Sequence, residues 1–177
     1  MPAPGQPRPA LFLDRDGVIN VDRNYVYRIA DFEWVPGAAE AIAAFNARGW
    51  WVFVVTNQSG IARGYYTEDD MLALHDWMNQ RLAEKSARID RIYHCPFHDE
   101  GTIPEYTRDS YDRKPRPGML IRAMTDFPVI REQSFMIGDK DADMEAARAA
   151  GVRGFHFTGG DLHQFSEWAL ADMGESR

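Results

Sequence analysis

Two aspartates stand two positions apart at the end of the first apolar run in the chain. The run Ala10-Leu-Phe-Leu13 leads directly into Asp14, and Asp16 follows after a single arginine. One carboxylate of such a pair can attack a phosphorus atom and form an aspartyl-phosphate. The other can protonate the leaving alkoxide and later activate water. Because an isolated Asp-x-Asp is also typical of a solvated turn, the rest of the sequence must decide between the two interpretations.

Two further polar clusters directly follow apolar runs. Thr56-Asn-Gln-Ser59 comes after a β-branched and aromatic run, and Gly138-Asp-Lys140 comes after another apolar run. In an open parallel sheet the carboxyl ends of the strands border the ligand crevice. Three such clusters therefore favour one shared site over three independent turns.

These side chains suit a phosphate group and a divalent cation. Oxygen atoms from Asp14, Asp16 and Asp139, with waters and a phosphate oxygen, match the octahedral shell of Mg²⁺. The cation is needed because a carboxylate that attacks a phosphate dianion meets like-charge repulsion. Thr56 offers a hydroxyl to the phosphate, and Lys114 offers a positive charge to the nucleophile and the phosphoryl group. We therefore predict Mg²⁺ as the cofactor of this site.

Strands and helices must alternate to bring these clusters together. Apolar runs predict strands over residues 10–13, 50–55, 89–94, 134–137 and 153–157. Amphipathic or alanine-rich stretches predict helices over residues 37–48, 67–82, 117–127, 143–150 and 162–170. Such alternation produces parallel strand pairs with right-handed crossovers. The expected fold is a doubly wound, mostly parallel, Rossmann-like α/β sheet with flanking helices.

The segment 95–116 interrupts this alternation, because it has no hydrophobic periodicity. A loop of this length inside a compact domain is usually functional or mobile. Since Lys114 lies near its end, we place the segment at the rim of the site.

The composition limits the classes of protein that carry such a site. The length of 177 residues fits a single domain over 10–177, preceded by a proline-rich, flexible arm over 1–9. The 20 basic and 27 acidic side chains give a net charge of −7, which argues against a nucleic-acid partner. No apolar run approaches the roughly 18–20 residues of a membrane span. The single cysteine excludes an intrachain disulfide and suits the reducing cytoplasm, where we expect a monomer.

Four motifs, in order along the chain, resemble those of the haloacid-dehalogenase-type phosphatase superfamily. They are Leu11-Phe-Leu-Asp-Arg-Asp-Gly-Val-Ile-Asn20, Val55-Thr-Asn57, Lys114 and Ile137-Gly-Asp-Lys-Asp-Ala-Asp143. Within that superfamily the chain resembles the D-glycero-D-manno-heptose 1,7-bisphosphate 7-phosphatases and the histidinol-phosphate phosphatases. The closer similarity rests on Asp14-Arg-Asp-Gly-Val-Ile-Asn-Val-Asp22, Thr56-Asn-Gln-Ser-Gly-Ile-Ala-Arg-Gly64 and Arg113-Lys-Pro-Arg-Pro-Gly-Met119.

The resemblance implies a role for each matching residue. Asp14 would be the nucleophile, and Asp16 the general acid and base. Mg²⁺ would be held by Asp14, the backbone carbonyl of Asp16, and Asp139, while Thr56 and Lys114 would bind the transferring phosphate. The family fold has almost no cap domain, which suits a phosphate on a primary carbon. The residues implied to meet the body of the substrate are Asp22, Tyr25, Asn57, Gln58, Ser59, Arg113 and Lys140.

Two more charged residues have competing interpretations. Arg63 is a candidate contact for a second phosphate, although an exposed loop arginine is the preferred interpretation. Asp143 is either a helper of the site or a carboxylate in the first turn of a helix, where the helix dipole favours it. We prefer the second interpretation for Asp143.

One departure from the family pattern concerns zinc. Relatives in this group are expected to carry a zinc loop with a Cys-x-His pair followed by Cys-x-Cys. Here Cys95 remains, and the other ligand positions are Phe97, Ser110 and Asp112. His94, His98 and Asp112 do not have the matching spacing for a tetrahedral zinc site with Cys95. We therefore expect structural zinc to be absent and the loop to be packed by Phe97, Tyr106 and Tyr111.

The resulting hypothesis is a Mg²⁺-dependent phosphatase that works through an aspartyl-phosphate and acts on a small phosphorylated sugar. The best match is the 7-phosphate of D-glycero-D-manno-heptose 1,7-bisphosphate. One alternative is histidinol phosphate or another small phosphomonoester. A more remote alternative is a non-catalytic, receiver-like phosphate-binding domain, which would carry its acceptor aspartate on the third strand. Activity on DNA ends is disfavoured by the net charge of −7.

Overall fold

A parallel five-stranded sheet forms the centre of the computed structural model, which describes residues 5–175. Its strands, in the spatial order β3-β2-β1-β4-β5, are β1 (Ala10–Leu13), β2 (Trp51–Asn57), β3 (Arg91–Cys95), β4 (Phe135–Gly138) and β5 (Arg153–His156). Successive strands are added to one side of β1 and then to the other. This order confirms the predicted doubly wound α/β fold and places its topological switch point beside β1.

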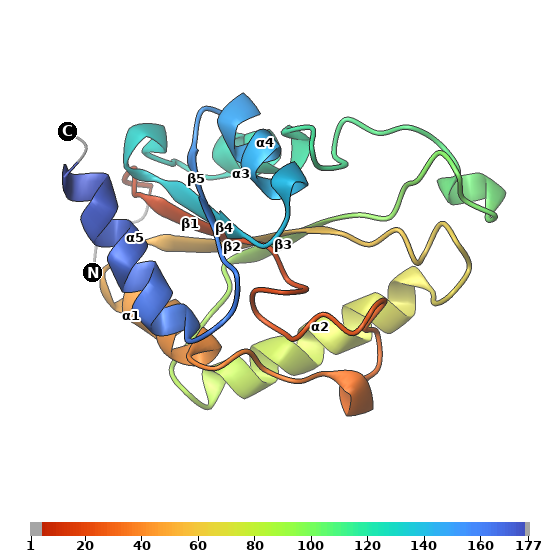
Figure 1. The fold of residues 1–177 in the computed structure, drawn as a ribbon, viewed down its shortest axis with the longest axis horizontal. Helices are drawn as coiled ribbons and strands as arrows, with labels where there is room; N and C mark the ends of the chain where they lie inside the picture. The colour runs from red at the N-terminus through yellow and green to blue at the C-terminus, as the bar shows by residue number, and fades with distance from the viewer. Residues whose placement is uncertain (1–4, 176–177) are drawn as a thin grey trace.

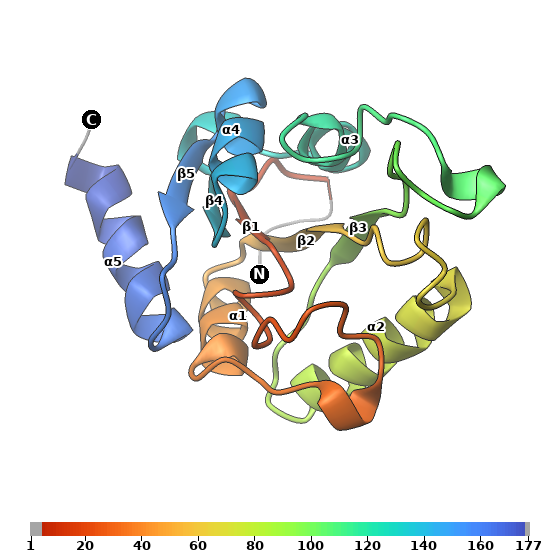
Figure 2. The ribbon, with the colours of Figure 1, turned by 45° about the vertical axis from the view of Figure 1, so that its right-hand side comes forward.

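Helices cover both faces of the sheet (Figures 1 and 2). One face carries α1 (Ala38–Ala47), α2 (Glu68–Ala83) and α5 (Leu162–Glu175). The other carries α3 (Gly118–Asp126) and α4 (Asp141–Ala149). Both faces of the strands are therefore buried, which explains why their sequences are continuously apolar instead of alternating.

Side chains of alternate strand residues enter two separate cores. Leu11 and Leu13 of β1 pack in the core beneath α1, α2 and α5, whereas Phe12 packs in the core beneath α3 and α4. Each core is closed by the apolar side of its helices, as with Phe45 of α1 and Leu120 of α3. This double packing holds the ends of the strands in a defined position relative to one another.

Helix α2 begins where the sequence predicts a cap. The Thr67 side chain accepts a hydrogen bond from the N–H of Asp70, which satisfies one of the free donors of the first turn. The predicted stripe of Met71, Leu74, Met78 and Leu82 is buried. His75 is buried beside this stripe, on the side of α2 that reaches the loop after β1.

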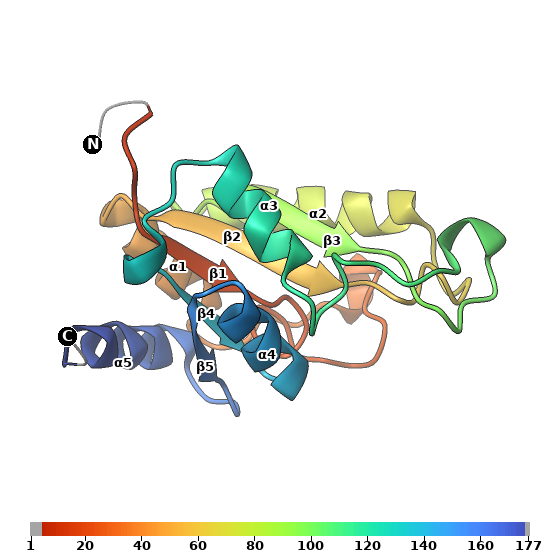
Figure 3. The ribbon, with the colours of Figure 1, turned by 90° about the horizontal axis from the view of Figure 1, so that it is seen from above.

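The loops at the carboxyl end of the sheet are longer than those at the other end (Figure 3). They include two short 3₁₀ helices, η1 (Ile29–Asp31) after β1 and η2 (Pro104–Tyr106) after β3. A third, η3 (Arg131–Gln133), precedes β4. The carboxyl-end loops surround the edge where the polar clusters lie.

Two details differ from the sequence expectations. Strand β2 extends through Thr56 and Asn57, because these residues pair with β3 in register with His94 and Cys95. At the other end of the sheet, the N–H of Arg8 donates to the carbonyl of Pro128, so the expected flexible arm is attached to the domain at this point. Residues 1–4 of that arm lie outside the described part of the chain.

Within the described residues, no helix is both long and apolar enough to cross a membrane.

Candidate active site

A cavity of about 460 Å³ opens at the carboxyl ends of β1 and β2 and beside the start of α4. It lies at the switch point of the sheet, where open α/β proteins bind their ligands. The predicted site residues that line it are Asp14, Asp16, Asp22, Tyr25, Asn57, Gln58, Ser59, Arg113, Lys114 and Lys140. Thr56 is fully buried directly beneath, hydrogen-bonded to Gln58. The structure thus brings together residues from four separate segments of the chain.

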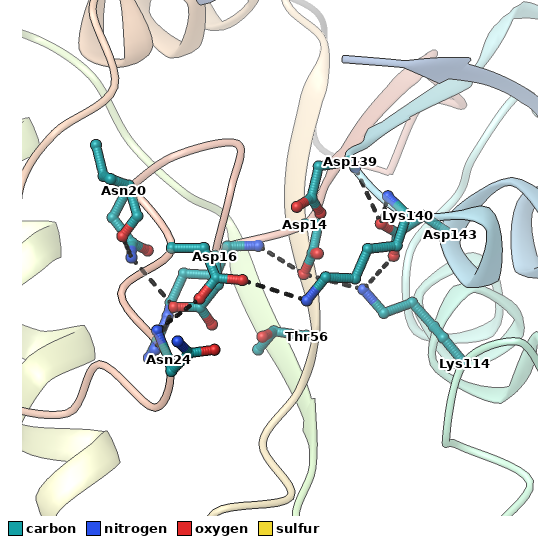
Figure 4. A network of polar contacts seen from close by, with 12 residues as sticks. Asp14, Asp16, Asn20, Asn24, Thr56, Lys114, Asp139, Lys140 and Asp143 are labelled. Atoms are coloured by element: carbon teal, nitrogen blue, oxygen red, sulfur yellow. Dashed lines mark hydrogen bonds and ion pairs between the residues drawn. The ribbon is translucent and has the colours of Figure 1, made fainter. Parts of the chain in front are cut away.

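The ammonium group of Lys114 connects Asp14 with Asp143 (Figure 4). Its Nζ is 2.9 Å from Asp14 Oδ1, 2.7 Å from Asp143 Oδ1 and 2.8 Å from the carbonyl oxygen of Val55. These acceptors use all three N–H donors of the group. Burial acts to lower the pKa of Lys114, but the carboxylates of Asp14 and Asp143 outweigh it and raise the pKa. Lys114 is therefore a permanent, buried positive charge beside Asp14.

One oxygen of Asp14 forms two contacts within the protein. Its Oδ1 accepts the N–H of Arg15 at 2.8 Å and the Lys114 contact. Burial raises the pKa of Asp14 to about 8; Lys114 opposes this rise, while repulsion from Asp143 and Asp16 adds to it. A second cation beside Asp14, in addition to Lys114, would favour its ionised form at neutral pH.

Asp143 belongs to the site, contrary to the preferred interpretation from the sequence. It does lie in the first turn of α4, and its Oδ2 accepts the N–H groups of Asp139 and Lys140, both at 3.1 Å. Its other oxygen, however, forms the buried ion pair with Lys114. In the sequence, the only indication of this role is that Asp143 follows Asp139 by four residues. Its position in a helix does not reveal an ion pair with Lys114, which is distant in the sequence.

Asp16 is surrounded by hydrogen-bond donors (Figure 4). Its Oδ1 accepts from Arg15 Nη2 at 3.0 Å and Asn20 Nδ2 at 3.1 Å, and its Oδ2 accepts from Gln58 Nε2 at 3.2 Å. Burial acts to raise the pKa of Asp16, but the charge and hydrogen bonds of Arg15, with those of Asn20 and Gln58, outweigh burial and lower it. The guanidinium of Arg15 is itself anchored by His75 of α2 and by the carbonyl of Val26.

The carboxylates of Asp14, Asp139 and Asp143 each place an oxygen within 4.8 Å of the others, and no other metal-binding group of three such residues occurs in the described chain. Both oxygens of Asp143 already accept hydrogen bonds, which makes Asp14 and Asp139 the better candidates to bind a cation. The Oδ1 atom of Asp139 is buried without a hydrogen-bond partner, and burial raises the pKa of this carboxyl. Oxygen donors in this arrangement fit a hard divalent cation such as Mg²⁺.

Two of the residues implied to contact substrate have amide groups bound within the protein. Asn57 exchanges hydrogen bonds of 3.0 Å with both the N–H and the carbonyl of Lys114, which fixes the loop to β2. Gln58 is only 2 % exposed and contacts Asp16, Thr56 and Tyr66. Tyr66 lines the cavity although the sequence motifs do not include it.

The opposite wall of the cavity is formed by the segment after β1. Asn24 and Tyr25 are consecutive non-glycine residues with positive φ, 59° and 58°, and such strain concentrates at functional sites. The N–H of Asn24 donates to Asp22 Oδ1, and Asp22 Oδ2 lies 3.3 Å from Lys140 Nζ. The Tyr25 ring stands edge-on against Tyr65, which keeps it at the mouth of the cavity.

Arg63 lies outside the group of residues that line the cavity. Its Nη2 is 3.3 Å from Nε2 of His98, and its backbone carbonyl accepts from the Thr102 hydroxyl. This agrees with the preferred interpretation of Arg63 as a loop arginine, although it is half-buried and not exposed.

The class of HAD-like hydrolases is defined by a parallel sheet with four polar features. These are an Asp-x-Asp pair after the first strand, a threonine on the second, a lysine from a later loop and an acidic cluster after the fourth strand. A family model described as HAD-hydrolase-like matches residues 111–167. A D-glycero-β-D-manno-heptose-1,7-bisphosphate 7-phosphatase of Rhodopseudomonas palustris is 48% identical over 173 residues, which cover 98% of this chain and 96% of that protein. The D-glycero-α-D-manno-heptose-1,7-bisphosphate 7-phosphatase of Burkholderia mallei is 48% identical over 81% of this chain and 76% of its own length.

Two solved structures share this architecture. A HAD-like phosphatase of Mesorhizobium loti superposes with a TM-score of 0.85 at 36% identity, over 97% of this chain and 88% of that one. The D,D-heptose 1,7-bisphosphate phosphatase of B. bronchiseptica, complexed with magnesium and phosphate, superposes with a TM-score of 0.81 at 29% identity, over 93% and 99%. The chain belongs to the HAD-like phosphatase family that contains the heptose-1,7-bisphosphate 7-phosphatases. It is therefore a hydrolase of phosphate esters, and the receiver-like alternative is set aside.

The electrostatics of Asp14 predict that Mg²⁺ binds more tightly as the pH rises. Below about pH 8 the metal-free Asp14 carries a proton, which must leave before its oxygen can bind a cation. We expect the Mg²⁺ affinity to rise between pH 6.5 and 8, by up to about tenfold per pH unit for one released proton. Calorimetry in buffers of different ionisation enthalpy measures both the affinity and the released proton. An affinity that does not change with pH, or an equal dependence in Asp14→Asn, would contradict this assignment.

The ion pair of Asp143 distinguishes it from Asp141, its exposed neighbour in the same helical turn. Asp143→Asn leaves Lys114 and the N–H groups of the turn with a weaker partner, so we expect a loss of about 1–3 kcal/mol in the free energy of unfolding. Asp141→Asn removes only a helix-dipole contribution, of about 0.3–1 kcal/mol. Urea unfolding of both variants at low ionic strength makes the comparison. Equal losses would mean that Asp143 acts solely through the helix dipole.

Proposed function

We propose that this chain removes the 7-phosphate of D-glycero-D-manno-heptose 1,7-bisphosphate in a Mg²⁺-dependent reaction. The observation that carries the proposal is the contrast between two neighbouring cations on the cavity. Lys114 is fully engaged beside Asp14, whereas Arg113 lines the same cavity with its Nη1 buried and without a hydrogen-bond partner. A guanidinium group with an unsatisfied donor beside the cavity suits the second phosphate of a bisphosphate.

In the first step a carboxylate oxygen of Asp14 attacks the phosphorus atom. The bond between phosphorus and the sugar oxygen breaks, and the departing alkoxide takes a proton from Asp16. The incoming phosphate places negative charge beside Asp16, which favours its protonated form against the donors that lower its pKa. The products are an aspartyl-phosphate on Asp14 and the free sugar hydroxyl.

In the second step water attacks the phosphorus atom of the aspartyl-phosphate. The ionised Asp16 takes the proton of that water, and the bond between phosphorus and the Asp14 oxygen breaks. Inorganic phosphate leaves, and the Asp14 carboxylate is regenerated. The reaction therefore needs one residue that exchanges a proton in both directions, and Asp16, which lines the cavity, is our candidate for this role.

The charge on the transferring group is balanced from two sides. Lys114 supplies a fixed positive charge, and since its donors are all used, it acts mainly through that charge. Mg²⁺, which Asp14, Asp139 and the carbonyl of Asp16 would hold, supplies the additional charge that lowers the repulsion between carboxylate and phosphate. The hydroxyl of Thr56, buried below the cavity, is the neutral donor for a phosphate oxygen.

The sugar would lie against the outer part of the cavity. Tyr25, Ser59 and Arg113 are the lining residues whose side chains suit contacts with the sugar and its second phosphate. The Asp22–Lys140 pair lies at the same rim and offers both a hydrogen-bond acceptor and donors to hydroxyl groups. A cytoplasmic location and a monomeric state remain predictions from the sequence.

Arg113→Ala tests the bisphosphate assignment. If Arg113 holds the second phosphate, the loss of a charge-assisted hydrogen bond should lower kcat/KM for the heptose bisphosphate by about 10- to 100-fold. A sugar monophosphate and histidinol phosphate should be affected much less. The measurement is phosphate release with Mg²⁺ from both anomers of the bisphosphate, from a sugar monophosphate and from histidinol phosphate.

The same panel includes Asp14→Asn, which should abolish turnover of every substrate because the nucleophile is lost. Wild-type protein that prefers histidinol phosphate by kcat/KM would refute the sugar assignment. Equal losses on mono- and bisphosphates in Arg113→Ala would place Arg113 at the reacting phosphate instead. Full activity in Asp14→Asn would refute the aspartyl-phosphate mechanism.

We also infer that the segment 95–116 is held without zinc, because the histidines near Cys95 already have protein partners. His94 Nε2 is 2.6 Å from Oε1 of Glu68, at the start of α2. His98 contacts Arg63 through Nε2, and its Nδ1 accepts the N–H of Glu100 at 3.0 Å. Nε2 of His94 and both ring nitrogens of His98 are therefore already engaged within the protein.

The two other candidate ligands have environments that oppose zinc binding. Asp112 forms an ion pair with Arg122 of α3. Burial raises the pKa of the Cys95 thiol, so the thiolate that zinc requires is disfavoured. The thiol lies 4.0 Å from the carbonyl of Phe97, as a weak donor. These contacts describe a packed cysteine.

Aromatic and ionic contacts hold the loop in place. The guanidinium of Arg108 lies 3.8 Å from the centroid of the Phe97 ring, and the centroids of the Tyr106 and Phe97 rings are 6.1 Å apart. The Tyr106 hydroxyl also donates to Glu68. Tyr111, in contrast, is 59% exposed, so its expected packing role is wrong.

This inference predicts that zinc contributes nothing to stability or activity. Purified protein should contain sub-stoichiometric zinc, and a zinc-selective chelator in excess Mg²⁺ should change Tm by less than about 1 °C. Elemental analysis and thermal unfolding, with and without the chelator, provide the measurement. A stoichiometric zinc content together with a lower Tm after chelation would show that the loop binds the metal through residues other than a matched tetrad.

A further inference from the structure

Both ends of the Gln58 side-chain amide form hydrogen bonds within the protein. Its Nε2 donates to Asp16 Oδ2 at 3.2 Å and to Thr56 Oγ1 at 2.9 Å, which uses both N–H groups. Its Oε1 accepts from the hydroxyl of Tyr66. The N–H of its backbone donates to the carbonyl of Cys95 at 2.8 Å. Gln58 therefore connects two residues of the reaction to a tyrosine outside the motifs.

Tyr66 is well placed to fix the direction of this amide. Its ring is buried against Ile61 and Met71 and stacks on Tyr27, with ring centroids 5.0 Å apart. Burial raises the pKa of its hydroxyl, so the group keeps its proton and acts as a donor. A donor at Oε1 turns the N–H side of the Gln58 amide toward Asp16 and Thr56, which both accept.

The contacts of the amide have a consequence for each partner. Asp16 is held at Oδ1 by Arg15 and Asn20, and Gln58 is its hydrogen-bond donor at Oδ2. Without Gln58, Oδ2 of Asp16 would lose its hydrogen-bond donor, and the carboxyl plane could rotate about the oxygen that Arg15 and Asn20 hold. Thr56 Oγ1 accepts from Gln58 and so keeps its own proton for a phosphate oxygen.

We propose that Gln58, oriented by Tyr66, is a positioning residue that aims the Asp16 carboxyl at the leaving oxygen of the substrate. This differs from the contact with substrate that the family resemblance implies for Gln58. The inference rests on the proposed phosphatase reaction, in which Asp16 gives its proton to the departing alkoxide. It does not depend on which phosphate ester is the substrate.

Tyr66→Phe and Gln58→Met test the proposal, since both keep the volume of the side chain and remove its hydrogen bonds. On an alkyl phosphate, whose leaving group needs a proton, we expect kcat to fall about 3- to 10-fold in Tyr66→Phe and about 10- to 100-fold in Gln58→Met. KM should change by less than about twofold, because the contacts that bind the substrate before the reaction are not removed. Tyr27→Phe is the matched control, because it removes a hydroxyl from the other ring of the same stack.

The leaving group separates a positioning role from a merely structural one. The burst of p-nitrophenolate from p-nitrophenyl phosphate reports the first step with a leaving group that departs without a proton. We expect this burst to change much less than the alkyl phosphate reaction in both variants. The double variant should be no slower than Gln58→Met alone, because Tyr66 acts through Gln58.

Three results would overturn the inference. A raised KM with unchanged kcat in Gln58→Met would make Gln58 a substrate contact. Equal losses in the alkyl phosphate reaction and the nitrophenolate burst would place its effect on the nucleophile or the phosphate. Independent, additive losses from Tyr66→Phe and Gln58→Met would separate the two residues. Wild-type protein inactive on every phosphate ester would instead overturn the proposed function and, with it, this inference.

Discussion

A buried positive charge is the constraint on which the rest of the site depends. Lys114 is 3% exposed, and a charge in such a position is costly unless it is paired and hydrogen-bonded. Its partners come from the end of β1, from the backbone of β2 and from the first turn of α4. The loop that carries Lys114 is fixed to β2 by Asn57. Folding can therefore complete this site only when these segments meet in one arrangement.

The same charge allows carboxylates to gather where repulsion would otherwise separate them. Asp14, Asp139 and Asp143 lie close together, and burial raises the pKa of both Asp14 and Asp139. Lys114 balances part of this negative charge, and a divalent cation would balance the rest. The net charge of −7 therefore does not describe the cavity, whose rim also carries Arg113 and Lys140. Such a local balance suits a phosphorylated substrate.

The sequence predicted the architecture because its signals are local. Continuous apolar runs, a capping threonine at Thr67 and polar residues at strand ends are readable within short windows. The motif residues then converge because parallel strands end at one edge of the sheet. Short sequence segments do not reveal contacts between distant parts of the chain. Examples are the ion pair of Asp143 with Lys114 and the hydrogen bonds of Tyr66 with Gln58 and of Arg15 with His75. No periodicity or motif encodes such pairs.

By itself, the sequence determined the fold class, the positions of the polar clusters after the strands and the candidate chemistry of Asp14 and Asp16, because residue type and spacing decide these. Only the tertiary structure decided which oxygens are free. It showed that Asp143 is occupied by Lys114 and two N–H groups, whereas Asp139 keeps an unpartnered oxygen. It also showed that the amide of Gln58 is used within the protein. A donor or acceptor is available for chemistry only if packing has not already satisfied it, and packing is a property of the folded chain.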